Sequence, residues 1–196
     1  MMTTQEDIIH EEILQAAIRL YRRFGPTKVT MDNVAQATGR SRSSLYYYFK
    51  DRDEIFQAVL ERIAEDVAAE IRLKVNAAAT VHDKIYAFCL AKISTTEAWK
   101  RVFVTMDQLM SADEKSKHSK VQDALHNKLM YLERGILIEV LSAAGLQNNA
   151  EQDMLAFIIS SSIRGVRREI HEYNDPHDAK AAAHLLSDMV SKWVQQ

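Results

Sequence analysis

The segment from Thr30 to Arg52, TMDNVAQATGRSRSSLYYYFKDR, most constrains what this chain of 196 residues can fold into. Thr30 is a good N-cap, and the apolar residues Met31, Val34 and Ala35 follow at the i, i+3 and i+4 spacing of one helix face. Gly39 then predicts a left-handed turn, because glycine has no Cβ to clash in that conformation. We therefore expect a short helix that ends in a glycine turn.

Ser41 can cap a second helix that runs to about Phe49. Leu45 and Phe49 lie four residues apart on the side that must be buried. The opposite side carries an arginine, a serine and two tyrosines: Arg42, Ser43, Tyr46 and Tyr47. These residue types donate hydrogen bonds to phosphate oxygens, and arginine also reaches guanine edges in the major groove. The pattern favours a DNA-binding helix-turn-helix over simple packing of the tyrosines on a neighbouring helix.

The segment resembles the N-terminal domain of the tetracycline-repressor (TetR) family of bacterial transcription regulators. The resemblance is carried by Thr30, Val34, Ala35, Gly39, Ser41, Ser44, Leu45, Tyr46, Tyr48, Phe49 and Lys50. It implies an all-α protein, with a three-helix helix-turn-helix DNA-binding domain over residues 1-52. A helical ligand-binding and dimerisation domain would follow over residues 53-196. This second part resembles the family only in length and helical character.

The resemblance also implies which residues contact DNA. Arg42 and Ser43 would contact base edges, with Tyr46 and Tyr47 at the edge of the groove. Phosphates would be held by Thr30, Ser44, Tyr48, Lys50 and Arg52. The complete predicted DNA-binding set is Thr30, Arg40, Ser41, Arg42, Ser43, Ser44, Tyr46, Tyr47, Tyr48, Lys50 and Arg52.

Two positions depart from the family pattern. Arg40 stands where the family usually has a small apolar residue between the two helices, and a buried guanidinium would be costly. We expect its stem to follow the apolar groove while its charged end reaches solvent or a phosphate. Arg52 replaces a common lysine, and either cation can bind a phosphate.

The charge of the chain is distributed unevenly. The formal net charge is −2, yet between Ala37 and Arg52 four cations stand against one acid, Asp51, a local charge of +3. Such an asymmetry suits a protein that binds DNA through one face.

The rest of the chain is predicted to be helical, because it has two prolines, five glycines and no alternating β-rich segment. Apolar spacing and breaker residues predict helices over residues 6–24, 51–78, 81–95, 97–110, 116–144, 151–173 and 176–195. The long helix from residue 51 would join the two domains and transmit changes between them.

Aromatic residues and methionines of the middle helices could line an adaptable apolar pocket for a hydrophobic small molecule. The set is Phe88, Trp99, Phe103, Met106, Met110, Leu129 and Phe157, with Ser161 or Arg164 as a polar anchor. Such stripes also occur as ordinary core, which is the alternative interpretation.

The last two helices carry wide apolar faces that a single chain seldom buries. We predict a dimer interface from Leu155, Ile159, Ile163, Val166, Leu185, Leu186, Met189 and Trp193. The resembling family pairs its last two long helices in this way, so a homodimer and an inverted-repeat operator are implied. Ordinary packing within one chain is the alternative.

Several other classes of protein are disfavoured. Cys89 is the only cysteine, which excludes an internal disulfide and, with the absence of an apolar signal region, favours the cytoplasm. In its apolar setting Cys89 is expected to be buried rather than a redox sensor. The sequence has no bilayer-spanning run, metal-ligand cluster, cofactor motif or catalytic motif.

The sequence therefore predicts a homodimeric, non-enzymatic transcriptional regulator without a cofactor. It would most simply be a repressor that a hydrophobic small molecule releases from an inverted repeat of double-stranded DNA. The alternative is a helical adaptor whose basic patch binds an acidic partner.

Overall fold

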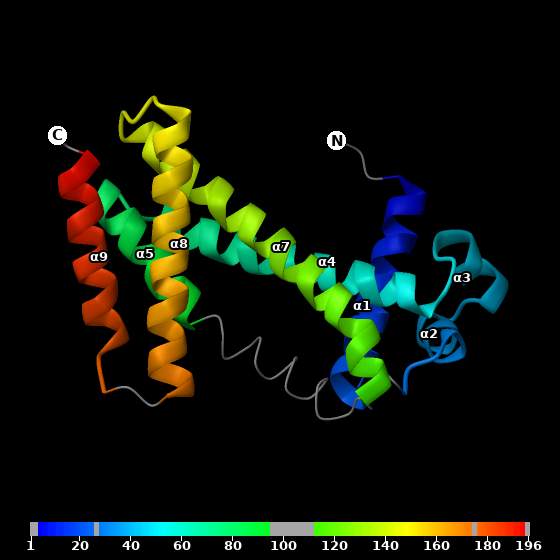
Figure 1. Ribbon diagram of the computed structural model, residues 1–196. Coiled ribbons are helices and arrows are strands. Elements are labelled where there is room, and N and C mark those ends of the chain that lie inside the picture. The colour runs from blue at the N-terminus through cyan, green and yellow to red at the C-terminus, as the bar shows by residue number, and fades with distance from the viewer. Residues whose placement is uncertain (1–3, 26–27, 95–111, 174–175, 195–196) are drawn as a thin grey trace. The chain divides into compact units, whose positions relative to one another are not determined.

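The computed structural model describes residues 4–25, 28–94, 112–173 and 176–194 (Figure 1). Regular structure in these ranges is entirely helical. The helices are α1 (Gln5–Phe24), α2 (Met31–Thr38), α3 (Arg42–Tyr48), α4 (Arg52–Asn76), α5 (Val81–Ser94), α7 (Ala112–Ala143), α8 (Asn149–Glu172) and α9 (Ala179–Val194). The predicted all-α class, with an N-terminal helix-turn-helix and a helical C-terminal region, is confirmed. None of the described helices is long and apolar enough to span a bilayer.

Most helix boundaries lie close to the predicted ones, and the start of α9 shows why some differ. The prediction placed this start at residue 176, whereas α9 begins at Ala179. The carboxylate of Asp178 accepts hydrogen bonds from the backbone N–H groups of Lys180 (3.1 Å) and Ala181 (3.3 Å). Asp178 is therefore the cap, and a capping side chain takes precedence over Pro176. The helix predicted over residues 97–110 lies outside the described residues.

The described residues form two compact units. The first comprises those up to residue 63 together with the described residues of α7 up to Leu125, and the second comprises residues 64–94 and 126–194. Both units include part of α4. The domain boundary after residue 52 stays a prediction.

In the first unit, α1 packs on α2, and α2 packs on α3. The start of α4 joins the same core, because the rings of Tyr21 on α1 and Phe56 on α4 meet edge to face at 5.3 Å. Completely buried apolar side chains come from all four helices, and include Ile13, Ala17, Val34, Leu45 and Ile55. This burial is what fixes the two short helices, α2 and α3, against the longer ones.

In the second unit, α5 packs on α8 and α9, and these two helices also contact each other. The core contains fully buried side chains from α4, α5, α7 and α8, among them Ile71, Phe88, Leu137 and Ile159. Ala183 and Val190 bring α9 into the same core. The apolar spacing of five helices therefore leads to one shared interior.

One ion pair is buried beside this interior. Lys92 of α5 donates a hydrogen bond to Glu133 of α7, and both side chains are almost completely shielded from solvent. Burial lowers the pKa of Lys92, while the attraction and hydrogen bond of Glu133 raise it. A buried pair of this kind links two helices strongly only while both partners are present.

We expect Glu133→Leu alone to lower the free energy of unfolding by about 3–5 kcal/mol, because it removes the carboxylate that pairs with a buried ammonium. The double variant Lys92→Met/Glu133→Leu should recover most of this loss, since no charge then remains buried. Urea denaturation of the three proteins measures both effects. A double variant as unstable as the single one would show that packing, not charge, explains the loss.

Candidate nucleic-acid interface

The helix-turn-helix begins with a reciprocal cap. The backbone N–H of Asn33 donates to the Thr30 hydroxyl at 3.2 Å, and the backbone N–H of Thr30 donates to the Asn33 side chain at 3.0 Å. The two bonds satisfy donors that the first turn of a helix otherwise leaves unpaired. The predicted N-cap at Thr30 is confirmed, and Asn33 completes it.

The turn between α2 and α3 depends on Gly39, whose φ is +65°. Gly39 N–H donates to the carbonyl of Gln36 at 3.2 Å, and Arg40 N–H donates to that of Ala35 at 3.0 Å. This is the Schellman arrangement of a helix end. No atom lies within 4 Å of the place where a Cβ would stand, so the left-handed backbone alone favours glycine here.

The second helix, α3, is held at both ends and on one side. Ser41 caps it by accepting a hydrogen bond from Ser44 N–H at 3.1 Å. Leu45 is fully buried, and Phe49 is buried just beyond the last turn. The Phe49 ring stacks on His10 of α1, with centroids 4.7 Å apart. The buried side of α3 is the predicted one.

The opposite side of α3 faces solvent, as the sequence predicted. Arg42, Ser43 and Tyr46 are exposed, and Tyr47 is 71% exposed although it is a large aromatic residue. An exposed cluster of aromatic, hydroxyl and cationic groups at the start of a helix is the arrangement that a major groove can accept.

Arg42 is oriented by two neighbours. Its guanidinium donates to the Tyr46 hydroxyl at 3.2 Å and to a carboxylate oxygen of Asp32 on α2 at 3.4 Å. It also lies over the Tyr46 ring, 5.7 Å from the centroid. The hydrogen bond that Arg42 donates to Tyr46 is the main cause that raises the pKa of Arg42, and the negative charge of Asp32 comes second. Arg42 therefore stays charged and is presented along the exposed face of α3.

Tyr47 is linked to the beginning of α1. Its hydroxyl donates to Glu6 at 2.8 Å, and its ring meets that of Tyr48 edge to face at 5.0 Å. The hydrogen bond to Glu6 is the main cause that raises the pKa of Tyr47. The pattern around α3 does not indicate Glu6, because 41 residues separate it from Tyr47.

Arg40 ends on an acid of α1. Its guanidinium forms an ion pair with Glu12 at 2.7 Å, its side chain is 27% exposed, and its Nε is buried without a hydrogen-bond partner among the described residues. The stem is therefore largely shielded, as expected, while the charged end binds Glu12. A phosphate contact of Arg40 would have to compete with this pair.

The residues predicted to hold phosphates lie at the ends of the short helices. Thr30 is the N-cap of α2, Ser44 and Tyr48 are half-buried on α3, and Lys50 is exposed in the following turn. Arg52 opens α4 and donates to the adjacent Asp53 at 3.0 Å. Together with Asp32 and Glu12, Asp53 offsets much of the local positive charge that the sequence count indicated.

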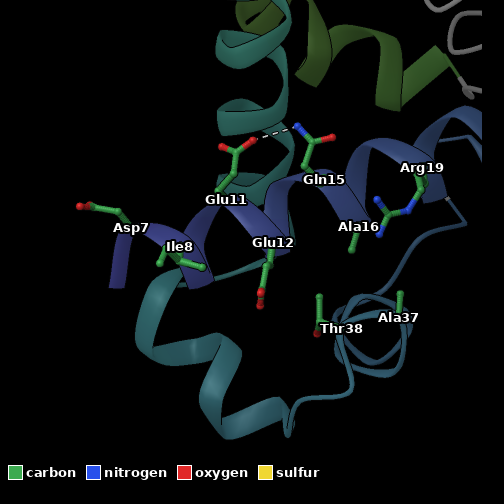
Figure 2. A pocket seen from close by; sticks show the side chains of 9 residues that line it. All are labelled: Asp7, Ile8, Glu11, Glu12, Gln15, Ala16, Arg19, Ala37 and Thr38. Carbon is green, nitrogen blue, oxygen red and sulfur yellow. Dashed lines mark hydrogen bonds between the residues drawn. The ribbon is translucent and has the colours of Figure 1, made fainter. Parts of the chain in front are cut away.

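Beside this interface, α1 and α2 border an open groove of about 540 Å³. Figure 2 shows Glu12 extending from α1 toward α2, while Glu11 accepts a hydrogen bond from Gln15 at 2.9 Å. The complete lining is Asp7, Ile8, Glu11, Glu12, Gln15, Ala16, Arg19, Ala37 and Thr38. The lining has three acids and one arginine, and none of the predicted DNA-binding residues lines the groove.

The residues predicted to line an effector pocket occupy different environments. Phe88 is fully buried in the core of the second unit, Leu129 and Ser161 are half-buried, and Phe157 is 53% exposed. Trp99, Phe103, Met106 and Met110 lie outside the described residues. Phe157 therefore points away from the core that contains Phe88.

The residues predicted to form a dimer interface divide between core and surface. Ile159 and Ile163 are buried within the chain's own core, where they are not accessible to a second copy. Leu155, Val166 and Leu186 are half-buried, whereas Leu185, Met189 and Trp193 are exposed. Met154, Phe157 and Ile158, absent from the predicted interface, are exposed as well.

An apolar groove of about 330 Å³ follows the exposed side of α8 and α9. Its lining is Glu151, Met154, Leu155, Ile158, Leu186, Met189, Val190 and Trp193. On α8, the apolar side chain accessible at the surface is therefore Ile158, whereas the predicted interface named its buried neighbour Ile159.

Cys89 is fully buried next to Phe88 in the second core. Burial raises the pKa of its thiol from 9.0 to about 12, although the nearby Lys92 acts in the opposite direction. A thiol that remains protonated and inaccessible is a poor nucleophile.

Taken together, the capped α2, the left-handed glycine turn and the exposed polar face of α3 form a helix-turn-helix of the kind found in DNA-binding proteins. A family model described as "Bacterial regulatory proteins, tetR family" matches residues 13–59, which contain this motif.

Relatives and solved structures agree with this match over most of the chain. The HTH-type transcriptional regulator BetI of Brucella abortus is 24% identical over 193 residues, which cover 95% of this chain and 91% of BetI. The structure of Salmonella enterica GusR is similar with a TM-score of 0.59 at 18% identity, covering 98% of both chains. Bacillus subtilis FadR in complex with stearoyl-CoA is similar with a TM-score of 0.51 at 14% identity, covering 93% of this chain and 97% of FadR.

The chain belongs to the TetR family of DNA-binding transcriptional regulators. Regulators of this family bind DNA operators and small-molecule effectors, and they are not enzymes. The likeness to the two solved structures extends the family fold beyond the matched 47 N-terminal residues, from 13 to 59, to the helical C-terminal region.

We expect Cys89 to react with a thiol reagent only when the protein unfolds. Because the pKa of its thiol is raised in the folded state, its contribution to stability is complete below pH 9.0 and is lost as the pH rises toward about 12. The free energy of unfolding of the wild type and of Cys89→Ala, measured across this pH range, gives the contribution of the thiol as the difference between the two proteins. Rapid labelling of the folded protein would contradict the expectation.

Proposed function

We propose that this protein is a repressor that binds an inverted-repeat operator as a homodimer and dissociates from it when a hydrophobic small molecule binds. Residues 1-52 would form the DNA-binding domain, and residues 53-196 the ligand-binding and dimerisation domain. The protein would act in the cytoplasm, where its operator DNA is accessible.

The observation that carries the proposal is the exposed face of α3. A helix of seven residues presents Arg42, Ser43, Tyr46 and Tyr47 to solvent while its other side is buried. Arg42 would contact a guanine edge with its planar guanidinium, and the tyrosines would contact the phosphate backbone beside it. Lys50, Arg52 and the caps Thr30 and Ser41 would hold neighbouring phosphates.

The exposed apolar side of α8 and α9 supports the homodimer. Met189 and Trp193 of α9, with Met154 and Ile158 of α8, line an apolar groove on the surface of one chain, and Leu185 of α9 is exposed as well. A second copy of the same two helices would cover this groove through an isologous contact. Two α3 helices about 34 Å apart would then fit successive major grooves on one side of the duplex.

The proposal of a hydrophobic effector is supported by the core of the second unit and by one solved structure with a similar fold. This unit has a core of its own, which includes Phe88 of the predicted pocket set. Bacillus subtilis FadR, whose fold is similar, was solved with stearoyl-CoA. Binding of the effector would shift the population away from the form that fits the operator, with a coupling of about 1–3 kcal/mol.

Selection of bound sequences from a random duplex library tests the proposal directly. We expect one inverted repeat, bound by two copies of the chain, with an affinity that falls steeply as salt increases. Recovery of no preferred sequence and a shallow salt dependence would instead favour a helical adaptor that binds an acidic protein.

Within the selected operator, Arg42→Ala should cost about 1–3 kcal/mol of binding free energy and relax the preference at one base position. Lys50→Ala should weaken binding to all sequences alike and lower the salt slope by about one. Titrations of operator and random DNA at two salt concentrations separate the two effects. Lys180→Ala, which removes an exposed cation from α9, is the control. Equal losses on both DNAs for Arg42→Ala would contradict its role in base recognition.

For the dimer, Leu185→Glu should shift the protein toward monomer, because it puts a charge among the exposed apolar side chains of α9. Leu73→Glu on α4 is the matched control, since Leu73 is 72% exposed and Leu185 is 63% exposed. Sedimentation equilibrium measures both. A dimer unaffected by Leu185→Glu, or equally weakened by Leu73→Glu, would place the interface elsewhere.

A further inference from the structure

A group of charged and polar side chains of the second unit extends from the buried Lys92 on α5 to the exposed His126 on α7 and the half-buried Arg164 on α8. Lys92 of α5 is paired with Glu133 of α7. One of the terminal nitrogens of Arg164 on α8 lies 3.4 Å from a ring nitrogen of His126 on α7. The ammonium of Lys92 also approaches the sulfur of Met130 at 3.9 Å. Lys92 of α5 and Arg164 of α8 are therefore close enough to repel each other, beside polar side chains of α7.

Arg164 and Ser160 of α8 have polar atoms that are buried and unsatisfied. The Nε of Arg164 is shielded from solvent and has no hydrogen-bond partner among the described residues. One turn earlier, Ser160 is 1% exposed, and its hydroxyl also lacks a partner there. Residues four apart lie on the same helix face, so the two unsatisfied donors are neighbours. Buried donors are rarely left in this state unless something else binds to them.

Positive charge accumulates around these donors. The pKa of Lys92 is lowered first by burial and then, against the effect of Glu133, by the proximity of Arg164 and Arg167. An ammonium that has a carboxylate partner is thus also repelled by two guanidinium groups. The described partner of Arg164, His126, is an imidazole and supplies no negative charge. The guanidinium of Arg164 is therefore the group of this cluster that can bind an anion.

Apolar groups border the same region. The Lys92 ammonium lies over the ring of Phe88, 5.9 Å from its centroid, and Leu129 and Met130 of α7 are half-buried. Methionine adapts its shape to different apolar ligands. The surroundings therefore suit a ligand that has both a charged end and an apolar part.

We propose that this cluster is the effector site, and that the effector is a carboxylate with an apolar chain. Its carboxylate accepts hydrogen bonds from the guanidinium of Arg164 and the hydroxyl of Ser160, and its chain lies along Leu129 and Met130. The inference rests on the proposed effector-controlled regulation and defines the chemical class of the effector. Arginine suits this role because its planar fork can bind both oxygens of a carboxylate.

Calorimetric titration of the full-length protein, without DNA, tests the class of ligand. The probes are decanoate, decanol and decylamine, which share one chain and differ in the charge of the head group. We expect decanoate to bind about tenfold more tightly than decanol, the gain typical of a hydrogen bond to a charged group, and decylamine to bind most weakly. Equal affinity for the three probes, or no binding of decanoate, would overturn the proposal.

Variants of α8 test the residues. Arg164→Gln should remove the preference for decanoate, Arg164→Lys should retain part of it, and Ser160→Ala should weaken it. Arg168→Gln is the matched control, because Arg168 is exposed on the same helix and lies 3.5 Å from Glu169. A preference that survives Arg164→Gln in a protein with normal helicity and thermal unfolding would exclude Arg164 as the anchor.

Failure of the inference and failure of the proposed function give different results. If an operator is found but decanoate shows no preference dependent on Arg164, the effector class is wrong and the regulator proposal stands. If decanoate binds through Arg164 but leaves operator affinity unchanged, the site stands as a carboxylate site and its control of DNA binding is excluded.

Discussion

The presentation of the residues predicted to bind DNA depends on the burial of two side chains, Leu45 and Phe49. Helix α3 has only seven residues, and isolated helices shorter than about 12 residues are barely stable in water. The helix is therefore held by its neighbours: Leu45 is completely buried, and Phe49 stacks on His10 of α1. The cap at Ser41 and the left-handed turn at Gly39 fix its start. Together these contacts give the exposed side of α3 one defined orientation.

Features determined by a few neighbouring residues could be predicted from the sequence. The caps at Thr30 and Ser41, the turn at Gly39 and the buried side of α3 all follow from local backbone chemistry and helical spacing. The partners of the cationic and aromatic groups could not be predicted, because they depend on how distant segments pack. Glu12 is 28 residues from Arg40. Nothing in the spacing of these residues indicates that α1 supplies acids to the helix-turn-helix.

The C-terminal helices show a different limit. Apolar residues surround much of α8, so their spacing alone does not decide which side faces the chain's own core. Ile159 is buried against α5 and the other core helices, whereas its neighbour Ile158 is exposed. The packing of α5 and α9 against α8 determines which of these two isoleucines is buried. Likewise, Lys92 and Glu133 are ordinary helix residues in the sequence, and their burial as a pair depends on the contact of α5 with α7.

The acids around the helix-turn-helix would affect the difference in affinity between an operator and arbitrary DNA. In the free protein, Arg40, Arg42 and Arg52 each have a carboxylate within ion-pair distance, from Glu12, Asp32 and Asp53. A phosphate that binds one of these cations must displace a carboxylate, so the contact is an exchange of one anion for another. Such exchanges would contribute little free energy to the binding of arbitrary DNA. The genome contains a vast excess of arbitrary sites, and a surface whose three arginines are already paired with carboxylates would bind to them more weakly.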